Sequence, residues 1–193
     1  MKKTLLVLSI TLMGTLLGTN VKGQVNNELS LGLVEVTMLA TTATPVALTL
    51  APTSAGLAIL SSVSDDSKRL QISSIVTGSK DVPVLHTVKA SLLAGSAVPA
   101  GTYLNLQALV PAIASGVSGG LLGTSAGDVK LPMVPGSAVN VITGIGSCFS
   151  GADATNGYTL KYTWGVDLAG NYADIRATTG TSVTVVLTLS SIQ

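Results

Sequence analysis

Strict alternation of apolar and polar side chains marks the stretch Tyr158-Thr159-Leu160-Lys161-Tyr162-Thr163-Trp164-Gly165-Val166. In an extended chain its two tyrosines, leucine, tryptophan and valine fall on one face, and its threonines and lysine fall on the other. This period of two predicts a half-buried β-strand with the aromatic face in the core. The stretch decides the fold class, because weaker versions of the same pattern recur along the chain.

Apolar and β-branched runs separated by Gly, Pro, Asn, Asp and Ser predict the other strands. We place them at residues 29–40, 45–50, 57–63, 69–76, 84–93, 102–110, 139–145 and 182–190, with local pairing at 175–178. Ser64-Asp65-Asp66-Ser67-Lys68 is rich in turn formers, which predicts the tip of a β-hairpin. About eight to ten short strands predict an all-β fold, an antiparallel immunoglobulin-like or jelly-roll-like β-sandwich.

Glycines gather in residues 111–136, where Ser, Ala and Pro make up much of the remainder. This composition predicts a surface loop or a flap over one sheet, with a short helix at residues 111–115 as an alternative. Loops of this length usually carry a function or are mobile.

The N-terminus has the composition of a secretory signal peptide. Lys2 and Lys3 provide a positive start, residues 5–17 are apolar but too short to span a bilayer, and residues 21–23 form a small-x-small cleavage site. We therefore predict a signal peptide at residues 1–23 and a single β-sandwich domain at residues 24–193. The expected location is secreted, extracellular or at the cell surface of a Gram-negative bacterium, in preference to the periplasm.

Charge is scarce in this chain. Charged residues make up 10% of it and aromatic residues 3%, against 47% hydrophobic residues. Removing Lys2, Lys3 and Lys22 from the ten basic residues leaves seven against nine acidic ones, a net charge of −2 for the mature chain. The chain therefore lacks the basic patch that nucleic-acid binding requires. A polar but weakly charged surface favours packing against copies of the same protein.

Two segments match the G-x-S-x-G pattern of serine hydrolases, around Ser118 and Ser125. Both lie in the glycine-rich stretch, where chance matches are expected. The single histidine, His86, precedes both serines, whereas the hydrolase order places it after them. His86 and Cys148 could form a nucleophilic Cys–His pair, but nothing in their sequence context supports one. We predict no catalytic residue and no enzyme activity.

No ligand set for a metal or cofactor stands out. His86 and Cys148 are too few for a typical zinc site, so a strand histidine and a buried free thiol are expected. Two late loops hold side chains that could bind calcium, although turns use the same residues: Asp153, Asn156, Asp167, Asn171 and Asp174. We predict no metal site, no cofactor and no cofactor-binding residue.

Aromatic residues concentrate near the C-terminal end of the chain. Trp164 with Tyr158, Tyr162 and Tyr172 could form a platform on which sugars stack. Three of the four share the apolar face of the opening stretch, so the pattern favours a place in the core.

Four segments together have the style of a known group of proteins: the signal ending before Gln24, residues 144–149, residues 157–162 and the terminal strand at 183–189. In them the chain resembles the small exported β-sandwich proteins of Gram-negative bacteria, broadly the pilin-like and spore-coat-U-like surface subunits. The resemblance implies surface assembly rather than catalysis. Pilins of the chaperone–usher class commonly carry a disulfide, which a single cysteine cannot form. No functional residue can be transferred.

The sequence as a whole predicts a non-enzymatic structural subunit of the cell surface or medium that self-assembles through β-strand edges into a filament or surface layer. Expected partners are copies of itself or another envelope protein, with no nucleic acid and no transmembrane span after signal removal. Residues 24–40 are expected to act as an extended assembly strand, because they are terminal and apolar on both faces. The alternative is a surface adhesin or glycan-binding module that uses the loops at 111–136 and 146–157.

Overall fold

A computed structural model describes residues 32–59, 62–134, 136–167, 172–178 and 180–191. The predicted signal peptide at residues 1–23 lies outside this range, and so does the start of the strand predicted at 29–40. The chain divides into two units, residues 1–33 and residues 34–193, and the strands of the described residues belong to the second unit.

The second unit is built from antiparallel strands. The described residues hold no α-helix and one short 3₁₀ turn, η1 (Tyr172–Asp174). The strands are β1 (Val36–Thr41), β2 (Val63–Ile75), β3 (His86–Leu92), β4 (Thr102–Leu109), β5 (Gly119–Gly120), β6 (Thr124–Ser125), β7 (Asp128–Lys130), β8 (Ala138–Ile145), β9 (Cys148–Phe149), β10 (Tyr158–Val166) and β11 (Val185–Ser191).

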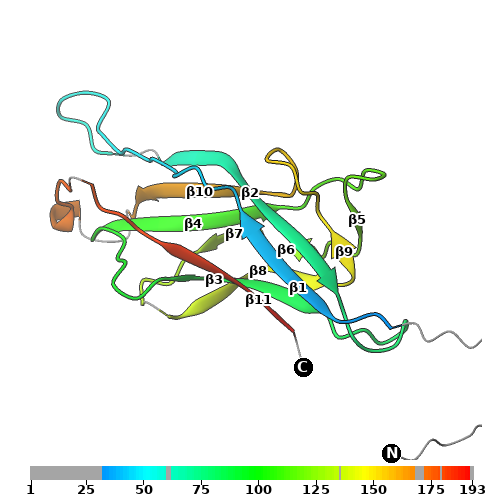
Figure 1. Cartoon of the computed structure of the whole chain (residues 1–193). Helices are drawn as coiled ribbons and strands as arrows, with labels where there is room; N and C mark the ends of the chain where they lie inside the picture. Colours follow the sequence, from blue (N-terminus) through cyan, green and yellow to red (C-terminus); the bar gives the residue numbers. More distant parts are fainter. Residues whose placement is uncertain (1–31, 60–61, 135, 168–171, 179, 192–193) are drawn as a thin grey trace, which may run out of the picture. The chain divides into compact units, whose positions relative to one another are not determined.

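These strands form two sheets (Figure 1). The larger sheet has the order β5-β9-β2-β10-β4-β7, with β1 paired to residues 70–75 of β2 and β10 paired to residues 63–70. The smaller sheet has the order β11-β3-β8-β6. The two antiparallel sheets pack against each other, which confirms the prediction of an all-β sandwich.

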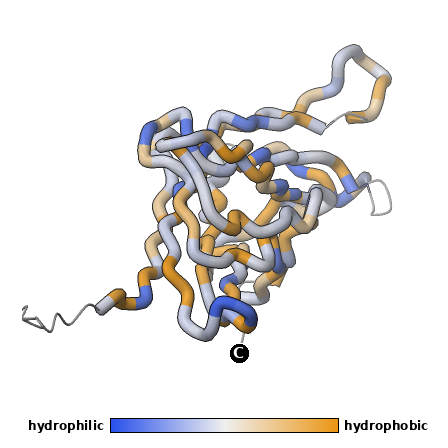
Figure 2. The backbone as a smooth tube through the Cα atoms, turned by 90° about the vertical axis from the view of Figure 1, so that its right-hand side faces the viewer, coloured by the Kyte–Doolittle hydropathy of each residue, from blue (hydrophilic) through white to orange (hydrophobic). Residues whose placement is uncertain are grey.

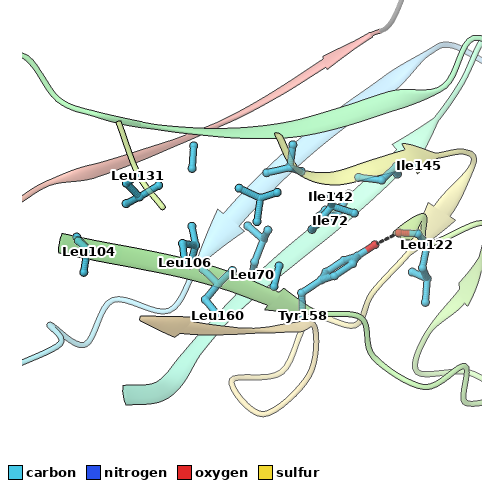
Figure 3. Close-up of a cluster of buried hydrophobic side chains, with 14 of the residues drawn as sticks. Leu70, Ile72, Leu104, Leu106, Leu122, Leu131, Ile142, Ile145, Tyr158 and Leu160 are labelled. Atoms are coloured by element: carbon cyan, nitrogen blue, oxygen red, sulfur yellow. Dashed lines mark hydrogen bonds between the residues drawn. The ribbon is translucent and has the colours of Figure 1, made fainter. Parts of the chain in front are cut away.

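The core lies between the sheets (Figure 3). Leu70, Leu106 and Leu160 of the larger sheet are fully buried, as are Val88 and Ile142 of the smaller one. Apolar burial of this kind supplies the main stabilising free energy of a domain. Tyr158 is also fully buried, and its hydroxyl keeps a hydrogen-bond partner there, since it donates a bond of 2.5 Å to the Leu122 carbonyl.

The two strands with the strictest alternation lie where the sequence predicts them. β10 covers the whole opening stretch, and β4 ends one residue before the predicted Val110. Within β4 every second residue from Thr102 to Ala108 is buried, and the residues between are half-buried. Along the backbone, short hydrophobic stretches are separated by stretches of intermediate hydropathy, with strongly hydrophilic segments scattered among them (Figure 2).

The predicted hairpin around residues 64–68 is wrong, because β2 runs through it without turning. Leu160 faces Lys68, but Tyr162 faces Asp65, so β2 holds one extra residue against β10 at this point. The turn formers therefore make a β-bulge rather than a reversal. Hydrogen bonds from the Ser67 hydroxyl and backbone N–H stabilise the Asp65 carboxylate and lower its pKa.

Four other local predictions are wrong, three of strands and one of a short helix. Residues 45–50 show the expected alternation in burial, but no strand pairs with them in the described structure, so they form no ladder. Residues 57–59 and 62 also lie outside any strand, and residues 175–178 form none. No helix forms at residues 111–115.

The glycine-rich stretch at 111–136 holds three short strands rather than only a loop. β5 pairs with β9 and β7 pairs with β4, both in the larger sheet. β6 pairs with β8 in the smaller sheet. The segment therefore connects the two layers of the sandwich, which period-two analysis cannot detect in strands of two or three residues.

Candidate functional site

The edges of the sheets differ in how well they are protected. β7 forms one edge of the larger sheet and is short and charged. Its Asp128 accepts a hydrogen bond of 2.7 Å from the Asn105 amide, and its Lys130 pairs with Asp167 at 2.8 Å. Short length and an edge lysine are the usual means by which a sheet avoids pairing with another chain. β5 and β6 have only two residues each and offer even less backbone.

β1 and β11 are the unprotected edges. They have six and seven residues, and neither contains a charged residue, a proline or a glycine. In the described structure β1 pairs only with β2, and β11 pairs only with β3. Figure 1 shows β1, in blue, close to β11, in red, and residues of the two strands are in contact. The two longest open edges thus lie on the same side of the sandwich.

The core is incompletely covered beside β11. Val185, Leu187 and Leu189 of this strand pack against the core but stay half-buried. On the neighbouring strand β3, by contrast, Val88 and Ala90 have no exposed surface. One further strand on the β11 edge would cover the half-buried side chains, so this edge is the candidate functional site.

His86 lies beside these edges, at the start of β3. It is 1% exposed, and its Nδ1 lies 2.9 Å from the Ser74 hydroxyl of the larger sheet. Its Nε2 lies 3.4 Å from a carboxylate oxygen of Glu35, just before β1. A neutral ring with its proton on Nε2 satisfies both neighbours, since Ser74 then donates to Nδ1 and Nε2–H donates to Glu35. The group ties the two sheets and the start of β1 together.

This Ser–His–Glu group differs from a catalytic triad in two respects. In a triad the carboxylate orients Nδ1 and the serine contacts Nε2, whereas here the two nitrogens are exchanged. Ser74 is also 2% exposed, so a substrate carbonyl cannot approach its hydroxyl in this conformation. Sequence reasoning missed the group because Glu35, Ser74 and His86 are far apart along the chain. A carboxylate between the apolar Val34 and Val36 was the one available signal.

The two G-x-S-x-G serines have structural partners. The Ser118 hydroxyl is buried, donates to the Ala112 carbonyl at 2.8 Å and accepts from the Ala114 N–H. The Ser125 hydroxyl accepts from the Gly127 N–H two residues later. These bonds hold local turns in the glycine-rich stretch, and neither serine meets His86 in a hydrogen bond within the described structure.

Cys148 is buried and free, as predicted. Removal from water raises the pKa of its thiol to about 11. A buried thiol with a raised pKa is a poor nucleophile, because the thiolate is the reactive form. The Cys–His pair considered from the sequence is also absent, since both His86 nitrogens contact other groups.

We expect Cys148 in the folded protein to react with a maleimide at least about 100-fold more slowly at pH 7.5 than an unfolded cysteine, given the shift from 9.0 to about 11. The rate should rise with pH and increase sharply in denaturant. The matched control is Cys148→Ser carrying Thr188→Cys, whose cysteine would lie at an exposed position. Equal labelling rates for the two folded variants would contradict the burial of Cys148.

The aromatic residues do not converge into a platform. Tyr158 is fully buried, and Tyr162 and Trp164 pack against the core, as the alternation predicts. The Trp164 indole donates to the Thr102 hydroxyl at 3.0 Å. Tyr172 is exposed and accepts a hydrogen bond from the Ile59 N–H.

The polar loops hold no metal cluster in the part of the chain that the structure describes. Asp153 and Asn156 bond each other across a turn, and Asp167 pairs with Lys130. Asn171, the fourth residue of the calcium hypothesis, lies outside the described residues. Beside the 146–157 loop there is an open hollow of about 420 Å³. Thr42, Ser67, Gln71 and Ala152 are among its lining residues, and no aromatic ring is.

Comparison with known proteins gives no relative. No protein-family model, no curated protein and no solved structure matches this chain. None of the described residues belongs to a helix with the length and hydrophobicity that a membrane span needs.

Proposed function

We propose that this protein is an exported, non-enzymatic structural subunit that joins copies of itself through β-strand edges into a filament or surface layer. The carrying observation is the contrast between its edges. β7 is short and charged, whereas β1 and β11 are long, uncharged and on the same side of the sandwich. An edge with these properties pairs readily with another strand.

Export in this proposal rests on the signal-like residues 1–23. The assembly segment is the part of the mature chain that precedes β1. The sequence predicts residues 24–40 for this role. Residues 36–41 are already paired with β2 of their own chain. The stretch that remains for a neighbour is therefore 24–33, with Leu29, Leu31 and Leu33 in one phase. Strand addition of this kind combines backbone hydrogen bonds with pockets for every second side chain.

The test is the size of the mature protein in solution. We expect chains that begin at Gln24 to form large species by sizing chromatography and linear or planar arrays by electron microscopy. A variant without residues 24–33 should be monomeric, because β1 and the core stay intact while the assembly strand is gone. Circular dichroism of the shortened chain should keep its β-sheet signal.

A matched pair of variants of the full mature chain tests whether assembly depends on the leucines of residues 24–33 or only on the presence of this segment. Replacing Leu29, Leu31 and Leu33 by serine should abolish the large species. Replacing Asn26, Glu28 and Ser30 by alanine, which lie in the opposite phase, should retain them. If the shortened chain keeps the size distribution of the full mature chain, assembly through this segment is wrong.

A further inference from the structure

The free edge of β11 has the features of an acceptor for one particular strand. We propose that residues 25–33 of a second copy of this chain add to it as a further strand of the smaller sheet. This inference rests on the proposed assembly function and names the site at which the assembly strand binds.

The apolar side chains of β11 and of residues 25–33 share a spacing of two residues. Val185, Leu187 and Leu189 pack against the core at every second position. They are half-buried, as are Val186 and Ser190 in the opposite phase. Residues 25–33 present Leu29, Leu31 and Leu33 at the same spacing, with Ser30 and Gly32 between them. A strand that pairs with β11 would place its leucines beside the half-buried residues and its small polar residues toward solvent.

The other open edge fits this strand less well. In β1 the half-buried residues are Val36 and Leu39, three positions apart, and Met38 between them is 63% exposed. A partner with a strict period of two cannot match that spacing over its length. β11 therefore suits the leucine pattern better than β1 does.

The position of β1 argues for a second copy over the same chain. Glu35 contacts His86, and His86 is the register partner of Ser191 at the C-terminal end of β11. To pair along its own β11, the preceding segment would have to fold back just before β1. Residues 32–35 contain no turn or bend that would reverse the chain.

The experiment uses cysteine pairs placed in separate chains. Mature protein carrying Ser30→Cys is refolded together with protein carrying Val186→Cys, Thr188→Cys or Ser190→Cys, the outward positions of β11, and then oxidised. We expect one of the three mixtures to give a disulfide-linked dimer at least tenfold above the control. Because each chain carries one introduced cysteine, a mixed dimer reports contact between copies. Cys148 contributes little background, since it is buried.

The control mixture pairs Ser30→Cys with Lys130→Cys on the charged β7 edge, which should stay uncrosslinked. If large assemblies persist but none of the β11 mixtures crosslinks, the acceptor is not β11, while the assembly function stands. If no assemblies form, both ideas fail. A disulfide within one chain of the double variant Ser30→Cys/Thr188→Cys, seen as a crosslinked monomer at high dilution, would overturn the second-copy assignment.

Discussion

Truncation of Leu106 to alanine is expected to lower the free energy of unfolding by about 2–5 kcal/mol, a large share of the stability of a domain of this size. Leu106 is fully buried in β4, with Tyr162 of β10 and Val129 of β7 as its neighbours in register. Its side chain belongs to the core between the sheets (Figure 3), so its loss leaves a cavity that close-packed neighbours fill only in part.

The matched control for Leu106 lies in the same strand. Leu109 is 44% exposed, so Leu109→Ala removes the same atoms from a place that already meets water. We expect it to cost less than about 1 kcal/mol. Urea unfolding followed by circular dichroism measures the free energy of unfolding of the two variants. Equal losses for the two variants would mean that the core does not lie where the burial pattern places it.

Substitution of Gly120 by alanine is expected to cost at least about 2 kcal/mol more than substitution of Gly127 by alanine. Both glycines have φ = +84°, so both variants carry the same backbone penalty of about 1–2 kcal/mol. Their surroundings differ. A Cβ at Gly120 would lie 2.2 Å from the Ser147 carbonyl oxygen and 2.8 Å from the Cys148 Cα, whereas nothing lies within 4 Å of a Cβ at Gly127.

The Gly120 contacts are backbone atoms of β9 and the residue before it, so they cannot swing aside as the end of a side chain does. The β5–β9 pair would have to separate. Thermal unfolding of the two variants side by side tests this, because the shared backbone penalty cancels in the comparison. Indistinguishable midpoints would show that the close approach of β5 to β9 is absent.

Alternation along the chain predicts the regular strands well, because period two is a direct consequence of burying one face of a sheet. Thr102–Leu109 is the best example, since its buried and half-buried residues alternate from Thr102 to Ala108. In Tyr158–Val166 the burial alternates at the start, and Tyr162 and Trp164 further along are half-buried. β3 and β8 also lie within a residue or two of their predicted limits. The sandwich class follows from these four strands.

The failures have physical causes of their own. Asp65 and Ser67 bond each other locally, a contact that favours a turn in isolation, but pairing with β10 turns the same contact into a bulge. Residues 45–50 have the right pattern, but none of the strands in the described ranges pairs with them, which a single-sequence pattern cannot reveal. In both segments the structure depends on whether a partner strand from elsewhere in the chain is present.

The candidate site was only partly predictable. Sequence reasoning found the strand at residues 182–190 and the apolar segment at residues 24–40, since both are local patterns. It could not identify which edges stay open, because β5, β6 and β7 are too short to show a period. The contact of His86 with Ser74 and Glu35 depends on β3, β2 and the residue before β1 coming together.

The glycine-rich segment passes from the smaller sheet to the larger one, and this limits how far the two sheets can separate. The Ala126 N–H bonds the Val141 carbonyl of the smaller sheet, and Asp128 already belongs to the larger sheet, so Gly127 alone connects the two layers there. One intervening residue gives a tether of about 7 Å between the flanking Cα atoms. The two sheets cannot separate at this point while Ala126 stays bonded to the smaller sheet and Asp128 stays paired in the larger one. Amide protons of both sheets should therefore exchange with solvent in one concerted opening.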